Sequence, residues 1–194
     1  FVYKGKNTTI PVGHAFPYQC SQEVYDEIGK QMQAAVTASG ADRCSINADV
    51  FVDGNKVSII EMGGRTGATC IPELISIYYG FDFYEKMLRS ALGETVEFNC
   101  AGKQPCMAKL LLSPVEGKIS HIDIEGIRRL EEKGVVVSLD FPVGHKVFAM
   151  ADGTDRIGHI IAKTEEESQL DAWMMEAYRC IFIDGVSLED IWKR

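Results

Sequence analysis

The segment from Asn47 to Arg65 constrains the fold of this chain more than any other stretch. Two runs of strand-forming residues flank Asp53, Gly54 and Asn55, and glycine and asparagine tolerate the left-handed backbone of a tight turn. The segment is therefore predicted to be a β-hairpin. A loop made of residues 53–55 would place position 52 opposite 56, position 49 opposite 59 and position 47 opposite 61.

In that register, three polar side chains gather on one side of the hairpin: Asn47, Asp49 and Glu61. Directly opposed side chains lie about 5 Å apart at Cβ and diagonal ones about 7 Å, so the two carboxylates would repel each other without a cation between them. Oxygen ligands at this spacing suit Mg²⁺, which takes one or two carboxylates and adds water and phosphate oxygens. A two-residue loop would instead separate the acids. A solvated polar sheet face is the alternative.

A glycine-rich loop follows the second strand. Gly63, Gly64 and Arg65 precede the small residues 66–69, and Pro72 then begins a helix. Backbone amides in such a loop can approach an anion, and the planar guanidinium of Arg65 matches phosphate oxygens. Together with the paired acids, the loop indicates a site for a metal and a nucleotide.

The order of these features resembles a known family. An acid, then Glu-x-x-x-Arg twelve residues later, a glycine-rich turn and a helix ending in Tyr-Gly-x-Asp are similar to the C-terminal half of the ATP-grasp superfamily. The similarity covers about residues 10–95. It is greatest to the branch of L-amino acid ligases and carbamoyl-phosphate-synthase-like enzymes.

The resemblance implies that ATP and Mg²⁺ are the cofactors. Asp49 and Glu61 would be metal ligands, and Arg65 would be the catalytic residue that contacts the phosphates. The cofactor-binding residues would be Asn47, Gly63 and Gly64. The family usually has Glu-x-Asn where this chain has Glu-x-Gly. Asn47 or water would therefore have to replace the missing amide ligand.

Helices and strands follow from local signals along the rest of the chain. Ser21 and Gly40 delimit an amphipathic helix, and Asp82 begins another. Beyond Gln104, strand-like runs alternate with turns, and Thr164 with Glu167 forms a predicted capping box. The predicted strands are Met107–Ser113, Lys118–Ile124, Val135–Phe141, Lys146–Met150 and Arg156–Ala162.

The predicted fold class is α+β. Residues 1–97 would form an antiparallel sheet with covering helices, as in the C-terminal subdomain of ATP-grasp proteins. Residues 98–194 would form a small antiparallel β-meander with a long C-terminal helix, resembling the small C-terminal domain of L-amino acid ligases.

Composition excludes several classes of protein. A net charge of −8 argues against a sequence-independent nucleic-acid binder, which needs clustered lysines and arginines. No apolar run approaches the roughly 20 residues of a membrane span, and no signal peptide is visible. The six cysteines show no Cys-x-x-Cys spacing. We therefore expect a cytoplasmic protein with reduced thiols. The first residue, Phe1, suggests a piece of a longer chain.

These observations predict part of an ATP-dependent carboxylate–amine ligase that acts through an acyl phosphate. Its partners would be ATP, a small carboxylate and an amine, with no nucleic acid or membrane, and a homodimer is compatible with this assignment. The piece by itself is expected to be inactive, because the phosphate-holding lysines lie upstream in complete enzymes. The alternatives are a non-catalytic interaction or dimerisation module and a divalent-metal hydrolase that uses the same acids.

Overall fold

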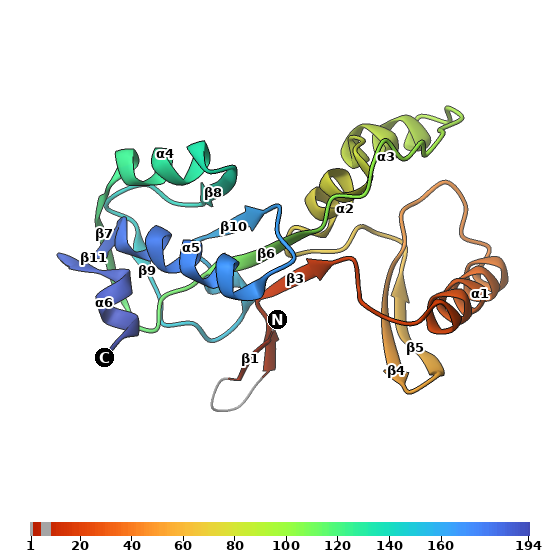
Figure 1. Ribbon diagram of the computed structural model, residues 1–194, viewed down its shortest axis with the longest axis horizontal. Coiled ribbons are helices and arrows are strands. Elements are labelled where there is room, and N and C mark those ends of the chain that lie inside the picture. Colours follow the sequence, from red (N-terminus) through yellow and green to blue (C-terminus); the bar gives the residue numbers. More distant parts are fainter. Residues whose placement is uncertain (1, 5–8) are drawn as a thin grey trace. The chain divides into compact units, whose positions relative to one another are not determined.

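The computed structural model describes residues 2–4 and 9–194, and its fold is α+β with antiparallel strand pairing (Figure 1). The chain separates into two compact units. One is formed by residues 1–16 and 104–194, and the other by residues 17–103. The predicted boundary lay between residues 97 and 98. In the structure, residues 1–16 group with residues 104–194, and residues 98–103 group with the other unit.

Helix α1 (Gln22–Ser39) begins the unit formed by residues 17–103. The Ser21 side chain accepts a hydrogen bond from the Val24 amide, and Gly40 ends the helix in a left-handed conformation. Both ends are where the sequence predicted them.

Strands β4 (Asn47–Asp53) and β5 (Lys56–Gly63) form an antiparallel hairpin beside α1. Gln31 Nε2 of the helix donates a hydrogen bond to the Val57 carbonyl oxygen at 2.9 Å. Val24 and Val57 are both buried. One face of the hairpin is therefore covered by the apolar side of α1.

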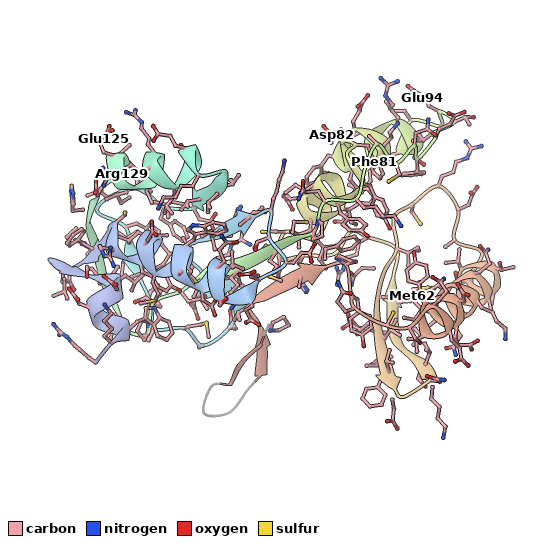
Figure 2. All side chains as sticks on the ribbon, viewed as in Figure 1. Met62, Phe81, Asp82, Glu94, Glu125 and Arg129 are labelled. Carbon is pink, nitrogen blue, oxygen red and sulfur yellow. The ribbon has the colours of Figure 1, made fainter. Side chains whose placement is uncertain are left out.

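Two short helices complete this unit, α2 (Ile71–Tyr79) and α3 (Phe83–Ala91). Gly80 ends α2, and the Asp82 side chain accepts a hydrogen bond from the Glu85 amide at 3.0 Å to begin α3. Figure 2 labels Asp82 at one end of α3 and Glu94 beyond the other. The predicted cap at Asp82 is confirmed.

The unit formed by residues 1–16 and 104–194 contains two four-stranded antiparallel sheets, ordered β3-β6-β10-β8 and β12-β11-β7-β9, and a separate pair, β1 with β2. The pairing is antiparallel, as predicted, but β6 lies beside β10 rather than beside β7, which follows it along the chain. Periodicity identifies strands but not their order in space. The strands are β1 (Val2–Lys4), β2 (Thr9–Pro11), β3 (Gly13–Phe16), β6 (Cys106–Leu111), β7 (Gly117–Ile122), β8 (Val135–Leu139), β9 (Lys146–Val147), β10 (Gly158–Ala162), β11 (Ile181–Ile183) and β12 (Val186–Ser187).

Three α-helices belong to the same unit: α4 (Ile124–Glu132), α5 (Glu167–Arg179) and α6 (Leu188–Trp192). Asp123 caps α4, and Glu125 and Arg129 lie on its exposed side (Figure 2). A 3₁₀ helix spans Gly153–Asp155. The six α-helices named here are those of the described residues.

The predicted capping box at Thr164 and Glu167 is wrong. Helix α5 begins at Glu167, its N-cap is Glu166, and no side chain caps it. The Thr164 hydroxyl instead accepts a hydrogen bond from the Glu166 amide at 3.0 Å and donates one to Gln169 Oε1 at 2.8 Å. The hydroxyl therefore orders the turn before the helix rather than the first helical turn.

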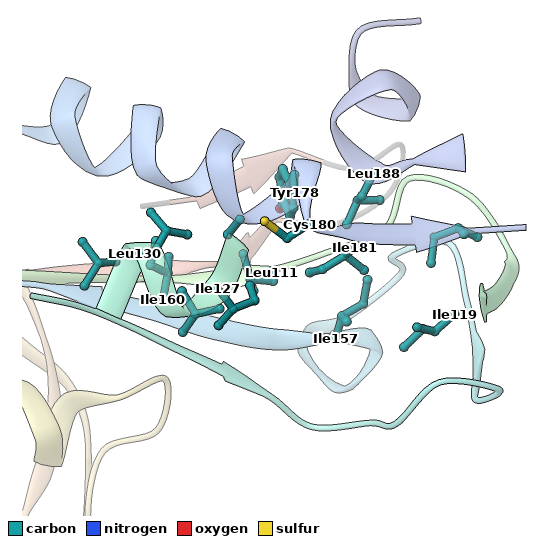
Figure 3. Close-up of a cluster of buried hydrophobic side chains, with 14 of the residues drawn as sticks. Leu111, Ile119, Ile127, Leu130, Ile157, Ile160, Tyr178, Cys180, Ile181 and Leu188 are labelled. Atoms are coloured by element: carbon teal, nitrogen blue, oxygen red, sulfur yellow. The ribbon is translucent and has the colours of Figure 1, made fainter. Parts of the chain in front are cut away.

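Buried side chains from both sheets and from the helices form a single apolar cluster in this unit (Figure 3). Leu111, Ile160 and Ile181 are fully buried strand residues, and Leu130 of α4 packs among them. The Tyr178 oxygen accepts a hydrogen bond from the Leu112 amide at 3.1 Å, while burial raises the pKa of Tyr178 to about 12. The tyrosine therefore remains a neutral member of the core.

A buried cation is also fully partnered in this unit. Lys109 of β6 is 8% exposed, and its Nζ contacts Glu167 Oε1 at 2.8 Å and the Asp171 carboxylate. Both acids come from α5. Because a buried charge is costly without partners, this triad ties α5 to β6.

Glu189 leads to a testable pH dependence. Arg179 donates two hydrogen bonds to its carboxylate, at 2.8 and 2.9 Å, and Lys193 donates a third at 2.8 Å. These bonds lower the pKa of Glu189 to about 2, below the usual value of about 4.3. A lowered folded-state pKa stabilises the protein above the unfolded-state value, and this contribution is lost as the pH falls through the folded value.

We therefore expect Glu189→Gln to lower the urea midpoint at neutral pH and to have a progressively smaller effect below about pH 4. Urea denaturation followed by tryptophan fluorescence over a series of pH values measures this difference. Glu132→Gln, which changes an exposed glutamate in the same unit, is the control. An unchanged loss of stability at low pH would contradict the role assigned to the charge.

Candidate functional site

The hairpin turn differs from the predicted one. Asp53 pairs with Lys56 and Val52 with Val57, so the connection is the two-residue turn Gly54-Asn55. Gly54 has a φ of 58°, which a glycine adopts without steric cost. The predicted three-residue loop and its register are therefore wrong.

A β-bulge then changes the pairing. Val50 faces Ile59, whereas Asp49 faces Glu61, so Ile60 is an extra residue in β5. The bulge turns Glu61 away from the side that carries Val57 and Ile59, where simple alternation had placed it. A two-residue turn was expected to separate the acids, but the inserted residue brings them directly opposite each other.

Asp49 and Glu61 lie on the side of the hairpin opposite to that of Val57, and both are exposed. Asn47 lies on the same side as Asp49 because it is two residues away along β4, and its partner is Gly63. Among the described residues, neither carboxylate forms an ion pair. Directly opposed like charges destabilise a β-pair. This arrangement therefore favours a bound cation.

Phe51 lies on this face, and sequence reasoning gave it no role. It follows Asp49 by two positions, is paired with Ser58 and is 59% exposed. A large aromatic ring that remains exposed beside two acids offers a flat apolar surface for a ligand. The sequence did contain a signal for this role. Side chains alternate between the two faces of a strand, so Phe51 lies on the same side as Asp49.

The glycine-rich loop packs against the end of this face. A Cβ atom on Gly67 would lie 2.7 Å from Asn47 Oδ1 and 2.7 Å from Ile71 Cδ1. Real Cβ contacts are not that short, so only glycine fits here without movement of the Asn47 amide. Gly67 is thus a second residue that sequence reasoning did not single out. Nothing in the sequence distinguishes it from the other glycines of the loop.

Arg65 lies on the surface beyond the end of β5. Its Nη1 donates a hydrogen bond to the Thr66 carbonyl oxygen at 2.8 Å, and its amide donates to the Gly63 carbonyl at 2.9 Å. A Cβ on Gly63 would be 3.7 Å from Arg65 Cγ, so the arginine stem passes over this glycine. Gly64 begins the exposed loop and adjoins the Cys44 sulfur.

The loop ends in two successive left-handed residues. Thr69 has a φ of 54° and Cys70 a φ of 65°. For a β-branched residue this conformation costs about 1–3 kcal/mol, and such strain gathers at ligand sites. Cys70 is the N-cap of α2, and its side chain does not cap the helix. The amides of the first helical turn therefore have no side-chain cap at the end of the loop.

Nearby Glu73 carries an unusual carboxylate. Its Oε1 accepts a hydrogen bond from the Tyr84 hydroxyl at 2.7 Å, while its Oε2 is buried without a partner among the described residues. Burial, followed by the hydrogen bond to Glu73, raises the pKa of Tyr84 to about 12. The pair therefore joins α2 to α3 through a neutral tyrosine.

Other metal sites find no support in the described residues. No group of three or more histidines, cysteines, aspartates or glutamates there could hold a metal ion. His145 stacks on the Phe141 ring at 3.8 Å, whereas His121 and His159 lie on β7 and β10. The acid pair thus offers two carboxylates and the Asn47 amide rather than a complete set of protein ligands.

Two further findings concern the whole described chain. All six cysteines lie within it and none forms a disulfide, which agrees with the expected thiols. Among the described helices, none is both long and apolar enough to span a bilayer.

No protein-family profile matches the chain. In sequence it is similar to an uncharacterised protein, y4rH, of Sinorhizobium fredii, with 24% identity over 168 residues. That alignment covers 86% of this chain and 35% of the relative.

Solved structures match the chain more extensively. Phosphoribosylglycinamide synthetase from Anaerococcus prevotii superposes with a TM-score of 0.79 and 23% identity, over 94% of this chain and 47% of that protein. L-amino acid ligase from Bacillus licheniformis has a TM-score of 0.67 and 19% identity, over 89% of this chain and 43% of the ligase.

A third structure carries ligands. The biotin carboxylase domain dimer of the Hydrogenobacter thermophilus 2-oxoglutarate carboxylase, in complex with MgADP, ADP and bicarbonate, has a TM-score of 0.68 and 17% identity. The match covers 94% of this chain and 42% of that one. The chain thus spans less than half the length of each of these three structures.

Proposed function

We propose that this chain, which has the fold of about half of an ATP-grasp enzyme, provides the metal-binding acids and the phosphate-contacting arginine of an ATP-dependent carboxylate–amine ligase. The observation that carries the proposal is the pairing of Asp49 with Glu61 across the bulge. Two exposed carboxylates face each other in a hairpin that is followed by a glycine-rich loop and by a helix without a side-chain cap.

The acid pair fits Mg²⁺ chemically. This ion is bound through one or two carboxylates and keeps water or substrate phosphates in its other positions. Asp49 and Glu61 would be the carboxylate ligands, and the Asn47 amide oxygen lies on the same side of β4. When bound, Mg²⁺ would neutralise charge on the phosphate oxygens of ATP.

The neighbouring residues suit the rest of a nucleotide. The Arg65 guanidinium would pair with phosphate oxygens, and the first-turn amides of α2 would favour negative charge at the end of the loop. The exposed ring of Phe51 would pack against an adenine base. These groups bind and orient the nucleotide, which is the main contribution of a protein to phosphoryl transfer.

In the proposed reaction a carboxylate oxygen attacks the γ-phosphorus of ATP, so that an acyl phosphate forms and ADP leaves. An amine then attacks the acyl carbon and displaces phosphate to give the amide. Arg65 would stabilise the negative charge on the transferring group. The separate assignments of residues 1–97 and 98–194 to the ATP-grasp and small C-terminal domains belong to this proposal.

A non-catalytic interaction module is the rival function. Gly63 favours it, because glycine has no side-chain ligand at the position where the family usually has asparagine, and Gly63 faces Asn47 across the hairpin. In that case the scaffold would hold a partner or a second copy without turning over ATP. Metal binding at the acid pair distinguishes the two functions.

Titration of the 194-residue chain with Mn²⁺, a paramagnetic substitute for Mg²⁺, tests the site. We expect selective broadening of the Asp49 and Glu61 amide signals in NMR spectra. Combined Asp49→Asn and Glu61→Gln substitution should weaken this binding by about tenfold or more. Asp53→Asn is the matched control because Asp53 is an exposed acid of the same strand. Equal broadening in the double variant would remove the basis of the proposal.

A further inference from the structure

A cavity of about 590 Å³ lies within the unit formed by residues 17–103, among the segment before β4, the glycine-rich loop, α2 and α3. Its apolar wall includes Ile46, Ile75, Phe83, Met87 and Phe98. Pockets that bind small molecules have volumes of about 300–1,000 Å³ and are mostly apolar. This cavity therefore has the size and surface of a ligand site.

The charges of this cavity have one sign. Arg43 and Lys86 line it, and no aspartate or glutamate does. The chain as a whole carries a net charge of −8, so the charge of this lining is opposite in sign to that of the whole chain. An anionic group is the complementary ligand for this lining.

Two hydrogen-bond donors in the cavity lack a strong acceptor. Lys86 is half-buried, and its ammonium forms no ion pair among the described residues. The Ser45 hydroxyl donates to the Met87 sulfur at 3.0 Å, and a thioether is a weak acceptor. A carboxylate would accept from both groups more strongly than the protein does. Arg43 provides a second cation, and its Nε also lies 3.8 Å from Oδ2 of Asp42, which does not line the cavity.

We propose that this cavity binds an amphipathic monocarboxylate, with its carboxylate at Lys86 and Ser45 and its apolar chain along Met87 and Phe83. A simple carboxylate fits better than a zwitterionic amino acid, because no acidic side chain lines the cavity to pair with an ammonium group. Arg43 strengthens the attraction for the carboxylate. The apolar chain provides the remaining binding free energy through burial.

The proposed pocket is separate from the acid pair but shares a wall with its loop. Gly64 and Thr66 line the cavity, and Arg65 lies between them in sequence. A bound carboxylate would therefore contact the loop that positions this arginine. The binding proposal does not depend on the ligase function, since it rests on residues outside the acid pair.

Isothermal titration of the 194-residue chain with three matched ligands tests the pocket: octanoate, 1-octanol and 2-aminooctanoate. We expect octanoate to bind about tenfold more tightly than either of the others, because only octanoate combines an apolar chain with an uncompensated negative charge. Methyl NMR of ¹³C-labelled methionines should show a shift of the Met87 signal, assigned with Met87→Leu. Equal affinity for all three ligands, or binding that leaves Met87 unshifted, would overturn the proposal.

Lys86→Gln provides the charge test. It keeps a side chain of similar length but removes the ammonium, so octanoate affinity should fall about tenfold while octanol affinity stays the same. Lys103→Gln, a change at an exposed lysine of the same unit outside the cavity, is the control and should change neither. A loss of octanoate binding in both variants, or in neither, would also overturn the proposal. Mn²⁺ should still broaden the Asp49 amide signal in Lys86→Gln. This result would show that the substitution affects the cavity and leaves the acid pair unchanged.

Discussion

Combined replacement of Asp49 by Asn and Glu61 by Gln is expected to lower ATP turnover at least about a thousandfold in a protein that carries this chain. Both substitutions keep the shape of the side chain and remove its negative charge. If the acids hold a metal that neutralises phosphate charge, the loss acts on the transition state of phosphoryl transfer. The measurement is release of ADP with a carboxylate and an amine present.

The same variant is not expected to lose stability. Asp49 and Glu61 face each other directly, so their repulsion destabilises the hairpin in the absence of a cation. Removal of both charges should therefore raise or preserve the urea midpoint while it abolishes turnover. A role in folding would instead lower both quantities. Asp53→Asn, on the same strand and opposite Lys56, is the control and should leave turnover within about twofold.

Unchanged turnover in the double variant would exclude the acids as ligands of a catalytic metal and would favour the interaction module. An unchanged rate together with lost Mn²⁺ broadening would show a metal site that is not catalytic. Full turnover loss with unchanged Mn²⁺ binding would place the ligands elsewhere. The two measurements thus separate binding of the metal from its use in the reaction.

Gly158→Ala is expected to cost at least about 3 kcal/mol of unfolding free energy, the largest stability effect we predict. Gly158 lies in β10 between Leu111 of β6 and Leu139 of β8. A Cβ atom there would lie 2.0 Å from the Ser138 carbonyl oxygen and 3.0 Å from the Leu139 Cα atom. Both contacts are with backbone, so no rotation of a side chain can relieve them.

Urea denaturation monitored by the fluorescence of Trp173 and Trp192 measures this loss, because both tryptophans pack against the core of the same unit. Val136→Ala is the control, since Val136 lies on β8 and is 52% exposed, and it should cost about 1 kcal/mol or less. Gly117→Ala should have an intermediate effect because its closest contact, at 2.4 Å, is the Ile183 side chain, which can move. Equal losses of unfolding free energy for Gly158→Ala and Val136→Ala would contradict this prediction. They would show that β8 and β10 can move apart with little loss of stability.

Short-range chemistry determined most of the elements of this fold. Ser21, Asp82 and Ser187 begin helices by accepting amide hydrogen bonds from nearby residues, and Gly40 and Gly80 end helices in left-handed conformations. Each of these interactions spans only a few residues. Thr164 is the exception, since its hydroxyl takes part in a turn instead. A local motif predicts a cap only where the following backbone adopts a helix.

The chemical character of the candidate site could also be inferred from sequence. Asp49, Glu61 and Arg65 are separated by short intervals on either side of a recognisable turn, and the glycine-rich loop follows directly. Residue type and spacing were therefore enough to propose two acids and an arginine near one another. Their roles as ligands and as a phosphate contact remain predictions.

The way in which the two acids meet depends on tertiary contacts. A β-bulge at Ile60 depends on the pairing of two strands, and alternation within one strand cannot show an inserted residue. The same limit applies to Gly67, whose contact with Asn47 arises from the loop folding back, and to the placement of β6 beside β10. Local sequence signals were enough to identify the helices, the turns and the residue types of the site. The register and the strand order depend on contacts between segments that are distant along the chain. These contacts contribute free energy only when the segments pack together, so neither feature can be inferred from local sequence.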